Sequence, residues 1–107
     1  LYSIIYMKPR PTYVLTSSAH EDVFGVDPII EGQHHNFEKW ISQYHTAHEL
    51  ERIKCCIIPR MRDIETGESF SSVIEFITPN GLCLFDVCIR SVGRSCLVVT
   101  FAEHQLV

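Results

Sequence analysis

Hydrophobic and polar residues alternate loosely along residues 69–78, around Phe70, Val73, Ile74, Phe76 and Ile77. Two further strand-like segments, 82–91 and 95–103, follow, and the three are separated by Pro79-Asn80-Gly81 and Val92-Gly93-Arg94. A period of two is typical of a strand, and an Asn-Gly pair favours a tight hairpin. The three segments therefore predict an antiparallel meander.

Two further strands are predicted at the N-terminus. Residues 2–7 and 12–16 are rich in β-branched and aromatic side chains, and residues 8–11 between them contain two prolines. Proline cannot donate to a strand ladder, so the prolines mark a turn. We expect these strands to form a hairpin.

The middle of the chain carries helical signals. Short helices are predicted over 19–24, 28–31 and 37–41, since each segment begins after a Ser, Asp or Asn that can cap it. Together with the strands, these helices indicate an α+β protein whose helices gather on one side.

A longer helix is predicted over 46–57. Thr46 and Glu49 have the spacing of a capping box, and Pro59 is expected to end the helix. The apolar residues expected along its buried face are Leu50, Ile53, Ile57 and, at the margin, Cys56.

Strand parity predicts a second sheet face that is only half polar. A layer of helices covers one face, so apolar residues on the other indicate a flanking helix or another subunit; the alternative is ordinary scattered surface residues. A homodimer or heterodimer is predicted to form through this outer face or through flanking helices. The residues predicted for the outer-face interface are Val73, Ile77, Leu82, Leu84, Cys88 and Val98.

Composition narrows the class of protein. The 107 residues suffice for one domain, 1–107, and 46% of them are hydrophobic. The net charge of −4, with no cationic cluster, disfavours direct nucleic-acid binding. No apolar run approaches the roughly 20 residues of a membrane span, and no signal peptide is evident. The absence of an initial Met suggests a piece of a larger protein.

The five cysteines form an odd set without a CxxC pair. Disulfide stapling is therefore not expected, and a reducing compartment, cytoplasmic or nuclear, fits best. Most of them have apolar neighbours in sequence, including Cys55 and Cys56, and are predicted to be small buried hydrophobes.

The order of these elements resembles that of a PAS domain, a small sensory and interaction fold. The similarity lies in residues 12–17, 23–32, 45–51 and 65–68, and more loosely in 98–103. It implies a five-stranded antiparallel sheet with short helices and one longer helix on one face. It also implies signalling by association within a sensory or transcription-regulatory protein.

The same resemblance implies a possible cavity between the long helix and the sheet. Its candidate lining for a small molecule or cofactor is Phe37, Trp40, Ile41, Leu50, Ile53, Phe76, Phe85 and Phe101, for which plain core packing is the alternative. Residues 36–43 lack the reactive Cys of flavin photoreceptors, although non-covalent flavin is left open. His45 or His48 is a haem-ligand candidate by resemblance, against a structural or solvated histidine.

Motifs for catalysis and metal binding are missing. No nucleophile elbow, P-loop, dinucleotide glycine run or zincin motif occurs, and no His or Cys spacing supplies a zinc site. Carboxylates such as Glu49 and Glu51 are expected on solvated helix faces. We therefore predict a non-enzymatic interaction module without a cofactor, with haem or flavin sensing as the alternative that visible absorbance would reveal.

Overall fold

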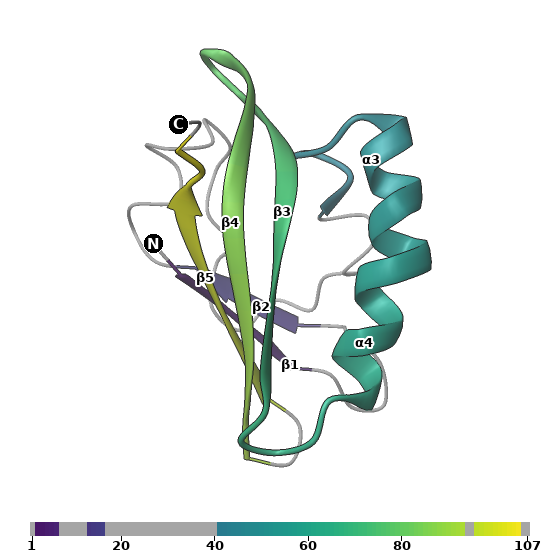
Figure 1. The fold of residues 1–107 in the computed structure, drawn as a ribbon, viewed down its shortest axis with the longest axis vertical. Helices are drawn as coiled ribbons and strands as arrows, with labels where there is room; N and C mark the ends of the chain where they lie inside the picture. The colour runs from purple at the N-terminus through teal and green to yellow at the C-terminus, as the bar shows by residue number, and fades with distance from the viewer. Residues whose placement is uncertain (1, 7–12, 17–40, 94–95, 106–107) are drawn as a thin grey trace.

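The computed structural model describes the backbone of residues 2–6, 13–16, 41–93 and 96–105, and within these ranges the side chains from residue 41 onward. Figure 1 shows the elements, with the helical segment beside a twisted sheet. The strands are β1 (Tyr2–Tyr6), β2 (Tyr13–Thr16), β3 (Ser69–Thr78), β4 (Gly81–Val92) and β5 (Cys96–Glu103). The helical turns are α3 (Ala47–Arg52), the π-helical η1 (Ile53–Ile57) and α4 (Ile58–Asp63).

Strands β3, β4 and β5 form the predicted antiparallel meander. β3 pairs with β4 from Ser69 opposite Arg90 to Thr78 opposite Gly81. β4 pairs with β5 from Phe85 opposite Glu103 to Val92 opposite Cys96. The structure confirms the predicted span of β3 and lengthens that of β4 by one residue at each end.

The β3–β4 connection is the tight hairpin turn that the Asn-Gly pair predicts, with Thr78 paired to Gly81. Among the described residues only glycines have positive φ, and Gly81 has φ 103°. Asn80 donates its backbone N–H to the Thr78 hydroxyl at 3.2 Å, and that hydroxyl donates to the Gly81 carbonyl at 2.8 Å. The Thr78 side chain thus closes the turn, and Gly81 takes the backbone conformation that a Cβ would disfavour.

The long helix does not end at Pro59, as predicted, but continues to Asp63. Proline has no N–H, and its ring clashes with the carbonyl four residues earlier. The preceding turn widens instead, and the Ile58 N–H bonds to the Ile53 carbonyl, five residues back. The π turn therefore places Pro59 in the first turn of α4, where its missing N–H is not needed.

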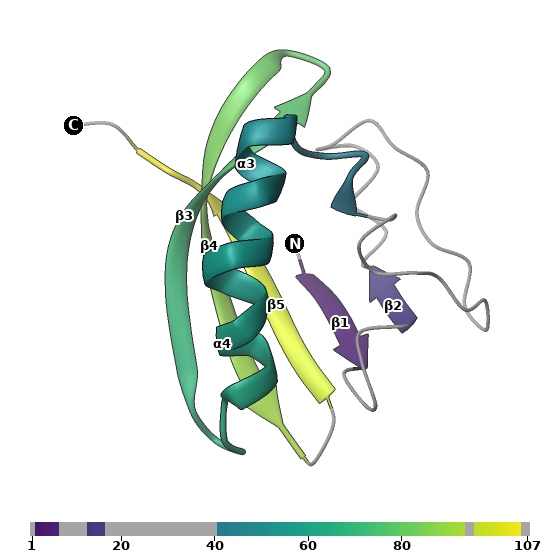
Figure 2. The same cartoon turned by 90° about the vertical axis from the view of Figure 1, so that its right-hand side faces the viewer.

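The core lies between the helical segment and the inner face of the sheet, and Figure 2 shows the helix in front of β3, β4 and β5. Burial alternates along β3 and β4, as it must when one face is covered. Arg60 lies 4.1 Å from the centre of the Phe70 ring and joins α4 to the start of β3. The buried hydrophobic residues are Ile41, Tyr44, Ile53, Ile57, Ile58, Met61, Phe70, Ile74, Phe76, Phe85, Val87, Ile89, Leu97 and Val99.

The predicted fold class needs correction, although its α+β class stands. We expected a packed five-stranded antiparallel sheet with several helices. The packed unit is instead the three-stranded sheet β3–β4–β5 and one helical segment. The backbones of β1 and β2 continue the ladder past β5, in the order β2-β1-β5-β4-β3, but the structure describes no side chain of either. The predicted helices over 19–24, 28–31 and 37–40 lie outside the described residues.

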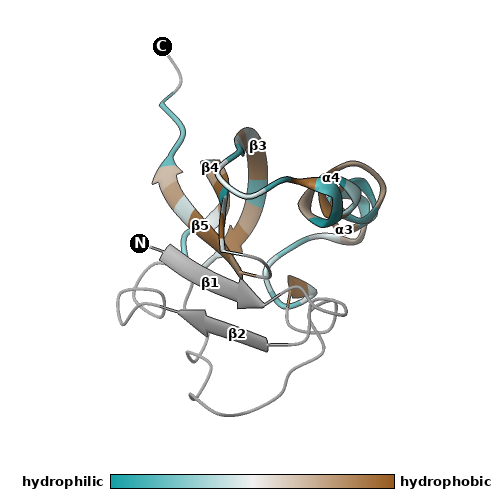
Figure 3. Ribbon diagram, turned by 90° about the horizontal axis from the view of Figure 1, so that it is seen from below, coloured by the Kyte–Doolittle hydropathy of each residue, from teal (hydrophilic) through white to brown (hydrophobic). Residues whose placement is uncertain are grey.

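Figure 3 views the molecule from below and shows the helical segment beside β3, the strand at the end of this order. An end strand presents unpaired N–H and C=O groups along its free side, which makes it a template for pairing with another chain. The placement of the helix beside β3 therefore brings polar side chains of α3 within reach of that edge.

Candidate interaction surface

The outer face of the sheet, opposite the helical segment, is defined by the strand register. Residues directly opposite one another in an antiparallel pair share a face. The outer pairs between β3 and β4 include Val73 with Asp86 and Ile77 with Leu82. On the β5 side, Arg90 lies opposite Val98. Both polar and apolar side chains therefore occupy this face.

All six residues predicted for an interface lie on this outer face according to the register. Leu82 is 57% exposed, and Val73 and Ile77 are each 40% exposed. Leu84, Cys88 and Val98 are half-buried. The register thus brings the six together on one surface, and their role in binding stays a prediction.

Charged groups stand among these apolar residues. Asp86 is on β4, and its carboxylate accepts a hydrogen bond from His104 at 2.8 Å, as an ion pair when the histidine is protonated. Arg90 lies on the same strand, two positions beyond Cys88. The outer row of β4 therefore places an acid and a base at equal spacing on either side of Cys88.

As far as the structure describes them, the residues predicted to line a cofactor cavity belong to the hydrophobic core or pack against it, and their role in binding stays a prediction. The Phe76 ring makes edge contacts with Phe85 at 5.2 Å and with Phe101 at 5.6 Å between ring centres. Ile41 and Ile53 are buried in the same cluster, and Leu50 packs against it. Phe37 and Trp40 lie outside the described residues. The alternative of plain core packing accounts for the other six positions.

An open hollow of about 280 Å³ lies elsewhere, between α4 and the start of β3. It is lined by Pro59, Arg60, Asp63, Ile64, Glu68, Ser69 and Phe70. None of the six predicted cavity residues that the structure describes lines it.

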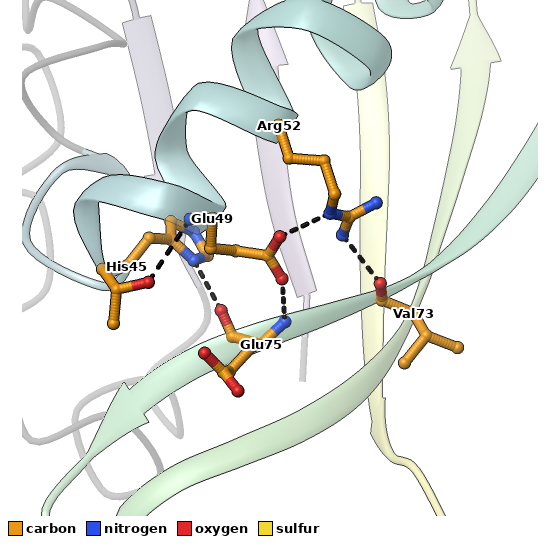
Figure 4. A network of polar contacts seen from close by, with 6 residues as sticks. His45, Glu49, Arg52, Val73 and Glu75 are labelled. Atoms are coloured by element: carbon orange, nitrogen blue, oxygen red, sulfur yellow. Dashed lines mark hydrogen bonds and ion pairs between the residues drawn. The ribbon is translucent and has the colours of Figure 1, made fainter.

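The free edge of β3 is held by a group of three side chains that we call the edge clamp: His45, Glu49 and Arg52 (Figure 4). The Glu75 N–H donates to the Glu49 carboxylate at 2.7 Å, and His45 Nδ1 lies 2.8 Å from the Glu75 carbonyl oxygen. Because a carbonyl only accepts, Nδ1 carries the proton in this contact.

Arg52 completes the edge clamp. Its Nε donates to the Glu49 carboxylate, and its Nη2 donates to the Val73 carbonyl at 2.9 Å. One turn before α3, the Tyr44 carbonyl accepts the Ile77 N–H at 2.6 Å. These contacts satisfy backbone groups of three alternate residues, Val73, Glu75 and Ile77, on the side of β3 that faces away from β4.

Burial and charge set the protonation of the edge clamp. Burial lowers the pKa of His45 and outweighs the hydrogen bond to the Glu75 carbonyl and the attraction of Glu49, both of which raise it; repulsion by Arg52 lowers it further. Burial raises the pKa of Glu49, but hydrogen bonds from Arg52 and the Glu75 N–H, with the charges of Arg52 and His45, bring it below its ordinary value. Neutral His45 and ionised Glu49 are therefore the favoured states.

The edge clamp was not predicted from the sequence. Glu49 was expected on a solvated helix face and in a capping box, whereas it is buried with its carboxylate on β3. The Thr46 half of the box is confirmed, since its hydroxyl accepts the Glu49 N–H at 3.3 Å. The signal available in the sequence was the 49, 52 spacing, which places two polar side chains on one face of a helix. His45 precedes this helix, which begins at Ala47.

The cysteine and histidine predictions have mixed outcomes. Cys55 and Cys56 are exposed on the π turn, which corrects their predicted burial, while Cys83, Cys88 and Cys96 are half-buried. His45 is a buried structural histidine, and His48 is exposed. Within the described ranges no three His, Cys, Asp or Glu side chains gather as metal ligands, and no helix is both long and apolar enough to cross a bilayer.

Comparisons of the chain with family models, with curated proteins and with solved structures find no match. The resemblance to PAS domains accordingly stays a prediction, and the function has to be inferred from the geometry of the described residues.

Proposed function

We propose that the chain is a non-enzymatic interaction module whose outer sheet face binds a second copy of itself. The observation that carries the proposal is the exposure of Val73, Ile77 and Leu82 on the face opposite the helical segment. Clustered apolar side chains on a sheet face are typical of binding surfaces. This proposal keeps the predicted interface and selects the homodimer among the predicted partners.

A second copy suits this face because the charges on β4 complement themselves. Consider a two-fold axis that lies in the interface and runs across the strands at Cys88. The rotation places Asp86 against the partner's Arg90, and Arg90 against the partner's Asp86. It also places Leu84 against the partner's Val92, which is 37% exposed. This arrangement matches the opposite charges of β4 and pairs Leu84 with Val92.

The size of the face limits the strength of the association. Three strands spaced about 4.8 Å apart, each roughly ten residues long, present an area at the low end of specific interfaces. We therefore expect a dimer with a dissociation constant in the micromolar range, about 8 kcal/mol or less in binding free energy.

Leu82→Glu tests the proposal by sedimentation equilibrium. The protein concentration runs from about 5 to 200 µM, which begins near the expected dissociation constant and extends above it. Leu82 is 57% exposed, so the substitution leaves the core intact while placing a charge among the apolar side chains. We expect dimer affinity to fall by about tenfold, because the added carboxylate would lose water among apolar side chains at the end of the interface. The matched control, Ala47→Glu, adds the same charge at an exposed position on α3.

The proposal predicts wild-type dimers, weakened by Leu82→Glu and unchanged by Ala47→Glu. A wild-type protein that stays monomeric throughout this range overturns it, as does equal weakening by both variants. Circular dichroism of each variant verifies that the fold is retained.

A further inference from the structure

The edge clamp brings titratable side chains to the backbone of an end strand. His45 is 7% exposed, its Nδ1 bonds to the Glu75 carbonyl, and its ring lies 4.4 Å from that of Phe76. Glu49 is 8% exposed and bonds to the Glu75 N–H. Two contacts with the edge of β3, one from His45 just before α3 and one from Glu49 on α3, thus pass through groups whose protonation changes with pH.

We propose that the edge clamp is an acid-released cover of the β3 edge: acidification separates α3 from Val73 and Glu75 while β3 stays paired with β4. The two sets of hydrogen bonds use different backbone groups. Residues 73, 75 and 77 direct their groups toward the helix, whereas the alternate residues 74 and 76 direct theirs toward β4. Release of the helix therefore leaves the β3–β4 ladder intact.

Both titrations act in the same direction. The pKa of His45 is lowered by burial, so its neutral form stabilises the closed clamp above the ordinary value of 6.5, and this stability is lost as pH falls below that value. Burial raises the pKa of Glu49, but the hydrogen bonds from Arg52 and the Glu75 N–H outweigh it and lower that pKa from 4.5. The contribution of Glu49 is present above 4.5 and is lost at more acidic pH. Opening therefore begins with His45, at a pH above the range in which Glu49 loses its charge.

The charged groups facing His45 support this order. On α3, Glu49 attracts the protonated His45 ring and Arg52 repels it. On β3, the Glu75 carbonyl accepts from the ring, and Figure 4 shows the Glu75 carboxylate directed away from it. The Phe76 ring covers one side. A proton added to His45 therefore places a positive charge in a buried site. There the attraction of the Glu49 carboxylate is opposed by the repulsion of the Arg52 guanidinium.

Release changes what the strand can bind. Opening exposes the Val73 carbonyl and both backbone groups of Glu75 along the edge. Exposed edge groups accept an added strand in the register of the sheet. This inference concerns the edge of β3 and does not depend on the proposed dimer, which uses the outer face.

Residue-resolved hydrogen exchange tests the inference in the wild-type chain between pH 7.5 and 5.0, a window around the ordinary histidine pKa of about 6.5. Each amide rate is divided by its intrinsic rate at the same pH to give a protection factor. We expect the protection of the Glu75 amide to fall several-fold at the acid end. The Ile74 and Phe76 amides, which face β4, are expected to keep theirs.

His45→Gln provides the matched variant. A glutamine amide can donate to the Glu75 carbonyl but does not titrate, so its Glu75 protection is expected to stay constant across the same window. Constant protection in the wild type overturns the inference. Equal losses at residues 74, 75 and 76 also overturn it, since they report unfolding of the whole sheet. A fall in His45→Gln as large as in the wild type assigns the change to another group and overturns it as well.

Discussion

Glu49→Ala is expected to lower the free energy of unfolding by about 2–3 kcal/mol. The substitution removes the acceptor of the Glu75 N–H and leaves the Arg52 guanidinium without its carboxylate. Loss of one partner from a buried polar pair is more costly than the pair's net contribution, because the remaining group stays desolvated. Arg52 is 37% exposed at its side chain, so solvent screening keeps the loss at the lower end of the range for buried pairs.

Urea denaturation followed by far-ultraviolet circular dichroism measures this effect. Glu51→Ala is the matched control, because Glu51 is exposed on the same helix and its replacement makes the same change in helix propensity. We expect the control to stay within about 0.5 kcal/mol of the wild type. Glu49→Gln should fall between the two, since its amide oxygen can still accept from the Glu75 N–H. Equal effects of the two alanine variants would contradict the burial of Glu49.

Phe76→Ala is expected to cost about 3–5 kcal/mol, a larger loss of stability than that expected for Glu49→Ala. Phe76 is 6% exposed and contacts the rings of His45, Phe85 and Phe101. Truncation removes these ring contacts and leaves a cavity between α3 and the sheet. The midpoint of thermal unfolding, measured by calorimetry, should fall accordingly.

Ile77→Ala is the control for Phe76→Ala, because the next residue along β3 points to the other face. Ile77 is 40% exposed, and its truncation is expected to cost less than about 1 kcal/mol in dilute monomeric protein. A larger loss from Ile77 than from Phe76 would reverse the assignment of inner and outer faces.

The strands of the meander were predictable because their signal is local. Alternation along residues 69–78 gives both the strand and its buried face, and this span matches β3. The outer position of Leu82 and Leu84 follows from the same parity. Burial on one face imposes a period of two on the sequence, so these features need no knowledge of distant contacts.

The features that sequence reasoning missed depend on contacts between elements. From the sequence alone, Glu49 is expected to be a solvated carboxylate. Its partner is the Glu75 N–H on β3, 26 residues later in the chain, and no local pattern indicates this contact. Pro59 reads as a helix end, yet packing of Ile57, Ile58 and Met61 against the sheet favours continuation through a π turn. The same wide turn leaves Cys55 and Cys56 on the solvent side, despite their apolar neighbours in sequence.

The packed sheet of five strands was over-predicted for a related reason. Strand propensity near the N-terminus indicates where strands form but not which core they join. The side-chain core that the structure describes lies between α3, η1, α4 and three strands. Within this core the ring of Phe76, one of the residues predicted to line a ligand cavity, contacts the rings of Phe85 and Phe101.

Recognition of β3 by the edge clamp involves main-chain atoms on the strand and side-chain atoms on the helix. The side chains of Val73 and Glu75 are therefore free to change over evolutionary time without loss of these bonds, except that proline at position 75 would delete the donated hydrogen. Positions 45, 49 and 52 lack this freedom. Related chains that diverge from this one should consequently retain the three side chains of the edge clamp. Their outer β3 residues can be replaced, and the binding preference of the outer face can change with them.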